Sequence, residues 1–449
     1  MSLLTLRRPR RNTLLLSTLL ACHLPSLTSA LFLTGSSSAV QDPFINPPST
    51  TCPVSQDGAT SDTFFWTHNP TCVTVVLPSS SESGLGTHQD FCAYTNAVFA
   101  SARGISFVTT PETAASLTAE IFRPFEDGIA WERELYEEKE TEGKGAGLFA
   151  TMEIKAGDTL IKKTPVLFVA KEVLVTPSRS RRALVLDTAV RQLPERTRNA
   201  FMGLAKSLGK EEAIEDIVLT NGFGVKVWDG TSHLVVVPEA AKINHACRPN
   251  AHKRFDDFTL GSDIFAMKDI KKGEEITMSY GFSTHPHPLR QEALLANWGF
   301  TCTCSLCTSP TTTLNASDTH LTQIRDLKAV LPSEPSDIPQ LLGLLPDLIS
   351  LLDEEDLILE RPMYEEILAY TWSSFGIEER AKYWAGRAQQ DWSTLAGKES
   401  WEAKRTRELE SDVKAHATWM SWEGDPWEGV GQGHPWDEKE GDDHHDHDH

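Results

Sequence analysis

The chain has 449 residues, of which 40% are hydrophobic and 23% charged, so its composition excludes a wholly disordered protein and allows two to four domains. Its 63 acidic and 42 basic side chains give a formal net charge of −21. The excess of acidic residues lies outside the central part of the chain. Within residues 129–309 the charges cancel, since this part holds 24 basic and 24 acidic side chains. This balance favours basic substrates over anionic ones and predicts no direct binding of nucleic acid, which requires a basic face.

Residues 1–30 have the features of a secretory signal peptide. Four arginines within residues 7–11 precede an apolar stretch at residues 14–27, and Thr28-Ser29-Ala30 resembles a cleavage site. The stretch is too short to span a bilayer, and we expect no transmembrane anchor elsewhere. We expect a secreted or secretory-pathway protein that loses residues 1–30. No acid precedes Asp42, so a mitochondrial protein is an alternative, and the arginine cluster also fits a nuclear or cytosolic one.

Residues 31–128 form an N-terminal region rich in Ser, Thr and Pro, with three cysteines at Cys52, Cys72 and Cys92. In an oxidising compartment two of them are able to pair, which leaves one thiol over. An equally weighted alternative is that all three cysteines stay unpaired and act as small apolar residues. The pattern of this region shows no catalytic constellation.

Short β-rich runs and glycine turns begin near residue 129 and continue to about residue 310. Many short strands with turn signals predict an all-β or mixed core and argue against a doubly wound sheet. One helical insert interrupts them at residues 180–216, where apolar residues recur at helical spacing. The expected strands lie at residues 147–150, 158–161, 225–228, 234–237, 263–266 and 275–278.

A helical region follows an expected linker at residues 309–317. Apolar residues with a 3.6-residue period predict helices throughout residues 318–421, and residues 369–385 weakly resemble one copy of a helix-pair repeat. We expect this region to present a surface to a protein partner. Ten acidic residues and five histidines in residues 423–449 predict a disordered, solvated tail, whose final His-Asp run is also able to bind metal loosely.

Three segments of the central region carry chemistry. The glycine-rich turn EGKGAGLFA at residues 142–150 lets a ligand approach the backbone, but it lacks the spacing of a dinucleotide-binding turn. Residues 243–250, INHACRPN, place an amide beside an imidazole at a turn. The third segment, GEEITMSYG at residues 273–281, is followed by NWGFTCTCSLC at residues 297–307.

The cysteines give the strongest physical signal. Cys302, Cys304 and Cys307 form a C-x-C-x-x-C motif, and tetrahedral zinc needs a fourth ligand that this motif lacks. Cys247 supplies the remaining thiol of the central region. We therefore predict a structural zinc site that ties the loop back to the Asn-His segment. A disulfide with free thiols is the alternative.

In this order and combination, the motifs resemble a SET domain followed by a post-SET zinc loop. The resemblance covers residues 131–310 and is closest to the fungal SET-domain proteins related to the SET-and-MYND group, although the insert contains no cysteine and so lacks the MYND element. The resemblance implies an α+β fold. The SET domain at residues 129–282 would have a knot-like strand crossing, and residues 283–310 would form the zinc loop.

The resemblance implies a protein-lysine N-methyltransferase that uses S-adenosyl-L-methionine and admits a substrate lysine through a narrow channel. Tyr280 matches the catalytic residue of the family. Trp298 and Tyr280 match positions that line the channel. The zinc ligands of the family match Cys247, Cys302, Cys304 and Cys307. The cofactor-binding residues match Lys144, Gly145, Ala146, Gly147, Asn221, Asn244, His245, Tyr280 and Phe300.

Trp298 departs from the family pattern, because close relatives usually have Tyr at this place. Tryptophan stacks on a methylammonium group but lacks the phenol hydroxyl and is bulkier. The departure leaves open a SET-fold protein-binding module that has lost turnover, with the helical region as its partner surface. A third reading is a secreted module in which the N-terminal region performs recognition. For the enzyme, we expect a protein substrate that presents a lysine, such as a basic histone-like tail.

Overall fold

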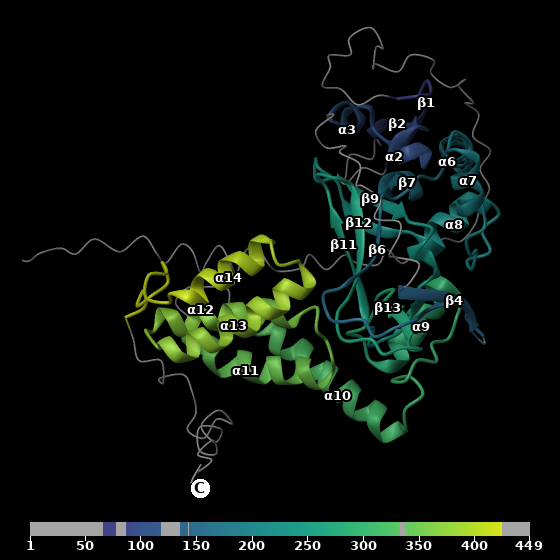
Figure 1. The fold of residues 1–449 in the computed structure, drawn as a ribbon. Coiled ribbons are helices and arrows are strands. Elements are labelled where there is room, and N and C mark those ends of the chain that lie inside the picture. Colours follow the sequence, from purple (N-terminus) through teal and green to yellow (C-terminus); the bar gives the residue numbers. More distant parts are fainter. Residues whose placement is uncertain (1–65, 78–86, 118–134, 142, 333–337, 424–449) are drawn as a thin grey trace, which may run out of the picture. The chain divides into compact units, whose positions relative to one another are not determined.

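The computed structural model describes residues 66–77, 87–117, 135–141, 143–332 and 338–423 (Figure 1). The expected signal peptide, Cys52 and nearly all of the expected acidic tail lie outside these residues. The chain divides into two compact units. One contains the described residues up to Phe282 together with Pro288–Thr308, and the other contains Ser283–His287 and the described residues from Ser309 onward.

A six-stranded sheet forms the N-terminal part of the first unit. Its strands, in spatial order, are β1 (Thr71–Leu77), β2 (Thr87–Asn96), β3 (Ile105–Thr109), β7 (Leu167–Ala170), β9 (Ser232–Val236) and β8 (Phe223–Lys226). All neighbours are antiparallel except β3 and β7. The central strand β7 is buried along its whole length, as its run of apolar residues requires. The sheet therefore crosses the domain boundary that the sequence predicts at residue 129.

The N-terminal region has more structure than its composition predicts. Cys72 and Cys92 lie opposite each other on β1 and β2 and form a disulfide, which decides between the two expectations for this pair. The short helices α2 (Phe99–Ala102) and α3 (Pro111–Ala115) flank β3. Thr110 caps α3 by accepting a hydrogen bond from the Thr113 backbone N–H, with proline at the first helical position.

Two smaller sheets carry the three motifs. The four-stranded sheet has the order β10 (Asn244–His245), β13 (Glu275–Met278), β5 (Gly145–Ala150) and β4 (Tyr136–Thr141). The three-stranded sheet has the order β11 (Ala251–Asp256), β12 (Gly261–Ala266) and β6 (Thr159–Lys163). All six expected strands are observed, and none of their bounds differs by more than two residues from the prediction.

The helical insert is longer than expected. It comprises α5 (Lys171–Leu174), α6 (Arg179–Arg191), α7 (Glu195–Met202) and α8 (Ala213–Asn221). One face of α6, with Val185, Leu186, Ala189 and Val190, packs on β1, β2 and β3 and completes a buried core. The insert ends at Asn221, close to the candidate site described below.

The second unit is helical, as the sequence predicts. Its helices are α10 (Thr311–Ala329), α11 (Ile338–Glu354), α12 (Arg361–Ser374), α13 (Glu378–Leu395) and α14 (Trp401–Ser411), and each packs against the next (Figure 1). The expected linker at residues 309–317 is wrong for most of its length, because α10 begins at Thr311 directly after Pro310. Within the described ranges, no helix combines the length and apolar character that a membrane span requires.

Candidate active site and cysteine cluster

The four-stranded sheet brings together motifs that lie about 100 residues apart in the chain. Strand β13 pairs in parallel with β10, which carries Asn244 and His245, and antiparallel with β5, which carries the glycine turn. The chain after β13 continues to Tyr280. The glycine turn, the Asn-His pair and the tyrosine therefore share one end of this sheet.

A carboxylate and an amide face each other beside the glycine turn. The Asn244 Nδ2 donates to Glu275 Oε1 at 2.8 Å, and Lys144 Nζ lies 3.6 Å from Glu275 Oε2. The Asn244 Oδ1 accepts no hydrogen bond from the described residues, so it stays available as an acceptor. The two side chains form an acceptor set suited to an ammonium group. Glu275 belongs to the segment at residues 273–281 that the sequence analysis selected. No role was assigned to it from the sequence, because its contact with Asn244 joins residues far apart in the chain.

Gly147 is the point where the glycine turn passes closest to this pair. A Cβ atom added there would lie 2.8 Å from both Asn244 Nδ2 and Glu275 Oε1, and 3.0 Å from Thr141 Oγ1. Only glycine leaves the carboxylate and amide in place. Gly145 adopts φ +72°, a left-handed conformation that glycine accepts without strain, and has no neighbour within 4 Å of such a Cβ.

Aromatic side chains surround Tyr280. The ring centroids of His245, Trp298 and Phe300 lie 5.3, 5.5 and 6.1 Å from that of Tyr280. The Tyr280 hydroxyl donates to the Ile243 carbonyl at 2.9 Å. Burial raises the pKa of Tyr280 to about 12, so the phenol is neutral at physiological pH. Phe282, which the sequence analysis did not select, lies 6.3 Å from Trp298.

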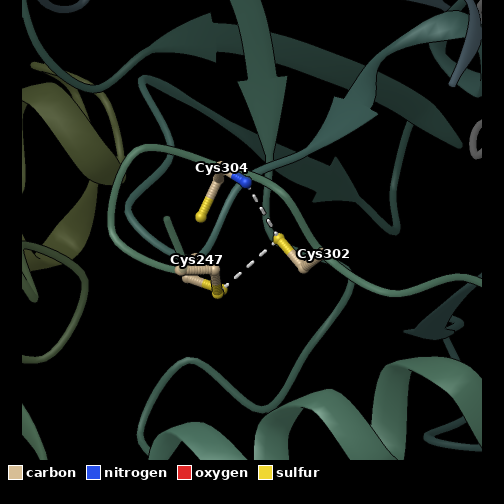
Figure 2. A group of neighbouring side chains, drawn as sticks. Cys247, Cys302 and Cys304 are labelled. Atoms are coloured by element: carbon tan, nitrogen blue, oxygen red, sulfur yellow. Dashed lines mark hydrogen bonds between the residues drawn. The ribbon is translucent and has the colours of Figure 1, made fainter. Parts of the chain in front are cut away.

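The four predicted zinc ligands lie in one cluster. All four sulfur atoms fall within 4.8 Å of one another, and the Cys247 Sγ is 3.9 Å from Cys302 Sγ and 3.5 Å from Cys307 Sγ. Figure 2 shows Cys302 and Cys304 of one loop lying beside Cys247, which comes from a separate stretch of chain. Zinc–sulfur bonds of about 2.3 Å set the sulfurs of a tetrahedral site about 3.8 Å apart. The donor set and its spacing therefore fit zinc, and the described cysteines of this cluster form no disulfide.

The comparison with protein families agrees with this geometry. Residues 145–281 match the model of the SET domain. This match identifies a SET domain in that part of the chain. The predicted resemblance is thereby confirmed, together with an α+β fold of mixed sheets and a helical C-terminal region.

Relatives of the SET domain have names that state an activity. The chain is 26% identical over 180 residues to "Histone-lysine N-methyltransferase set5" of Schizosaccharomyces pombe, an alignment that covers 39% of this chain and 51% of that protein. It is 38% identical over 65 residues to SET5 of Eremothecium gossypii, covering 14% and 13% of the two chains. It is 44% identical over 72 residues to ATXR2 of Arabidopsis thaliana, covering 16% and 15%. The chain thus spans at most about half the length of these relatives.

His245 connects the tyrosine of the SET domain to the cysteine cluster. Its Nδ1 accepts a hydrogen bond from the Tyr280 backbone N–H at 3.0 Å, so Nε2 carries the proton and donates to the Cys247 Sγ at 3.4 Å. Burial lowers the pKa of His245 to about 4, which keeps the ring neutral. Both ring nitrogens of His245 are therefore occupied by hydrogen bonds within the protein. Only its backbone and ring faces remain for contact with a cofactor.

The helix α9 (His287–Trp298) supports the cysteine loop with two residues that the sequence analysis missed. Arg290 is fully buried, and its Nη2 lies 4.0 Å from Cys307 Sγ. The Gln291 side chain accepts from the Cys302 N–H at 2.8 Å and donates to the Cys302 carbonyl at 2.9 Å. A buried guanidinium beside four sulfurs partly offsets the negative charge of thiolates. Periodicity gives no signal for these roles, because Arg and Gln on a helix usually face solvent.

The end of the insert holds the Trp298–Phe300 segment. The Trp298 Nε1 donates to the Thr220 carbonyl at 3.2 Å. Both amide hydrogens of Asn221 bind backbone carbonyls, those of Ala205 and Ile217, at 2.8 Å each. The contact of Thr220 with Trp298 thus places Asn221 near the site. The Asn221 amide nitrogen, however, already donates both of its hydrogens to backbone carbonyls. Its Oδ1 is the atom left for a ligand.

Proposed function

We propose that this protein is a protein-lysine N-methyltransferase that uses S-adenosyl-L-methionine. The observation that carries the proposal is a half-buried tyrosine with a neutral hydroxyl, placed near the Asn244–Glu275 pair and within the aromatic cluster of a SET domain. The names of the relatives support an enzyme over the binding-module alternative. The proposed substrate is a protein that presents a lysine, with a histone tail as one candidate.

The residues around the glycine turn fit the cofactor. We assign its ammonium group to the Glu275 carboxylate and the free Asn244 Oδ1, beside the backbone of Lys144, Gly145, Ala146 and Gly147. We place its adenine near Phe300 and the faces of His245, with Asn221 on the same side. When bound, the cofactor supplies a sulfonium methyl group, which is already an electrophile.

The chain's own task is to hold a neutral amine in line with that methyl group. Free lysine has a pKa near 10.4, and a dry aromatic wall favours its uncharged form. We assign this wall to Tyr280 and Trp298. The Tyr280 hydroxyl, held near the Ile243 carbonyl, orients the amine lone pair and stabilises the charge that changes during transfer.

The glycine turn gives a direct test of the cofactor assignment. We expect Gly147→Ala to weaken binding of S-adenosyl-L-methionine at least tenfold, because the added Cβ displaces Asn244 and Glu275. Calorimetric titration of both proteins measures this change. Gly203→Ala is the matched control, since a Cβ there would meet the Asn199 carbonyl at an ordinary 3.4 Å. Unchanged affinity in Gly147→Ala would remove these two side chains from the cofactor site.

We also propose that Cys247, Cys302, Cys304 and Cys307 bind one structural zinc ion in a post-SET loop at residues 283–310. Four thiolate ligands close a tetrahedral site and leave no position for catalysis. We propose that β10 and the segment with Tyr280 form the knot-like crossing of the family. The hydrogen bond from the Ala246 N–H to the Met278 carbonyl, 3.0 Å, supports this proposal.

The compartment and the flanking regions are further proposals. We propose that residues 1–30 are a signal peptide, that residues 318–421 present a partner surface, and that residues 423–449 are a solvated tail. The Cys72–Cys92 disulfide supports the secretory route, because disulfides persist in oxidising compartments. A mitochondrial or a nuclear and cytosolic location are the alternatives.

N-terminal sequencing of the protein purified from its own cells tests the signal peptide. We expect the mature chain to begin near residue 31, because cleavage follows a small side chain such as Ala30. Recovery of Met1 or Ser2 as the first residue would contradict a cleaved signal. A C-terminal tag traced in the same cells identifies the compartment independently.

The activity itself is tested by methyl transfer from radiolabelled S-adenosyl-L-methionine to whole lysate and to histones. We expect label on lysine side chains of at least one protein. Cofactor binding without transfer to any protein would favour the binding module, with Trp298 as the first suspect.

A further inference from the structure

A pocket of about 500 Å³ opens between β8 and β11, and none of its lining residues belongs to the glycine turn or the cysteine cluster. Its volume lies within the range of ligand pockets, about 300–1,000 Å³. We call it the basic pocket, and its lining residues are Phe223, Gly224, Val225, Lys226, His252, Lys253, Phe255 and Asp257.

The basic pocket gathers the ammonium groups of three lysines. Lys226 and Lys253 line it, and Lys171 Nζ would lie 3.2 Å from a Cβ placed on Gly224. None of these lysines forms an ion pair with a described residue. Asp257 is the one acidic residue of the lining. Burial lowers the pKa of His252 to about 3, so this histidine adds no charge at physiological pH.

Lys253 is the most constrained of the three cations. It lies over the Phe223 ring, with Nζ 5.2 Å from the centroid, and burial lowers its pKa. Lys253 is half-buried, and a cation partly removed from water without an ion pair to a described residue costs free energy. An anionic group entering the pocket would recover part of this cost by forming a charge-assisted hydrogen bond.

The basic pocket is connected to the proposed catalytic site through shared packing. Phe223 packs on the core cluster that contains Ile243, the residue whose carbonyl accepts the Tyr280 hydroxyl bond. Three residues before Phe223, the Thr220 carbonyl accepts the hydrogen bond from Trp298. The pocket and the proposed catalytic site therefore lie on connected elements of one compact unit.

An exposed aromatic side chain stands next to the basic pocket. Phe258, at the turn between β11 and β12, is 72% exposed. The Asp256 carboxylate holds this turn by accepting hydrogen bonds from the Phe258 and Thr259 N–H groups, at 2.9 and 3.3 Å. Aromatic residues are enriched in protein interfaces, so Phe258 offers an apolar contact to a polypeptide bound beside the pocket.

We propose that the basic pocket binds an anionic side chain of the protein substrate, a carboxylate or a phosphorylated residue, close in sequence to the target lysine. This inference rests on the proposed methyltransferase function and adds a substrate class to it. The chain's net charge of −21 predicts basic substrates, but recognition depends on the local charge, and here that charge is positive.

The test uses peptides with a single central lysine, whose neighbours are replaced one at a time by Glu, Gln, phosphoserine or Ser. Methyl transfer by the full chain gives kcat and KM, and fluorescence anisotropy of labelled peptides gives binding without turnover. We expect Glu or phosphoserine at one position to lower KM and Kd about tenfold relative to Gln or Ser, the gain typical of a hydrogen bond to a charged group. We expect kcat to change little, because the contact is remote from the transferred methyl group. The comparison of Glu with phosphoserine identifies which anion the pocket prefers.

Three variants assign the preference to the basic pocket. Lys226→Glu changes an exposed residue and should abolish or reverse the preference. Lys253→Met keeps the length of the side chain without its charge and should reduce the preference to less than about twofold, since the charged partner is lost. Lys210→Glu, on the exposed loop before α8, makes the same change of net charge and should keep the preference.

The outcomes separate this inference from the proposed function. Methyl transfer without any preference for an anionic neighbour would overturn the pocket inference alone, and so would a preference that survives both pocket variants. Selective binding of anionic peptides with no methyl transfer to any peptide would support the pocket and count against the enzyme. Absence of selectivity in both readouts would overturn the inference whatever the activity.

Discussion

Tyr280→Phe is expected to lower methyl transfer about a hundred- to a thousand-fold while leaving cofactor binding nearly unchanged. The change removes one hydroxyl and little volume, so the aromatic packing with Trp298 and Phe300 persists. Cofactor affinity rests on the Asn244–Glu275 pair and the glycine turn, which the change does not touch. A preorganised hydroxyl donor of this kind is commonly worth about 3–4 kcal/mol of transition-state stabilisation.

The measurement compares turnover on a substrate that the wild type modifies with calorimetric affinity for S-adenosyl-L-methionine. Tyr94→Phe is a matched control, because it removes the hydroxyl of a fully buried tyrosine in the six-stranded sheet, distant from the site in sequence and sheet. We expect the control to retain wild-type turnover. Equal turnover in Tyr280→Phe and the wild type would exclude Tyr280 from the mechanism.

Substitution of one cysteine of the cluster is expected to remove about one zinc ion per chain and to abolish activity. Four thiolates within 4.8 Å repel one another, and Arg290 supplies one positive charge among them. A zinc ion supplies two more, and binding at such sites contributes about 10–16 kcal/mol in zinc-finger peptides. We expect Cys304→Ser to loosen the segment with Trp298 and Phe300, because this segment leads directly into the cluster.

Metal analysis of the full chain against Cys304→Ser measures the zinc as a difference, which cancels metal held by the histidine-rich end. Activity and thermal unfolding of both proteins measure the structural consequence. Thr303→Ala is the control, since Thr303 is exposed and stands between two ligands. Equal zinc content in the wild type and Cys304→Ser, or a disulfide mapped between cysteines of the loop, would contradict the zinc site.

Local patterns predicted the elements in which the spacing of apolar residues along the chain matches the buried face of a strand or helix. The strand at residues 275–278 was predicted with its observed bounds, because Ile276 and Met278 alternate with polar residues over a half-buried sheet. The long helices after residue 318 were predicted from their 3.6-residue period, which a helix packed on one face imposes. The C-x-C-x-x-C spacing identified the cysteine cluster, because few arrangements bring thiols together within one loop.

Strand partners and buried polar contacts depended on the tertiary structure. The residues of β1 to β3 belong to a Ser-, Thr- and Pro-rich region, and their place in a sheet with β7 depends on a parallel pairing about 60 residues away. Glu275 and Arg290 look like ordinary surface charges in the sequence, and only their contacts with Asn244 and with the cysteine cluster give them roles. The sequence by itself determined the resemblance to a SET domain, the four cysteines of the cluster and the candidate tyrosine, since each belongs to a compact motif. Only the tertiary structure decided how Glu275, His245 and Arg290 join those motifs, because such contacts form between segments whose separation in the chain carries no local pattern.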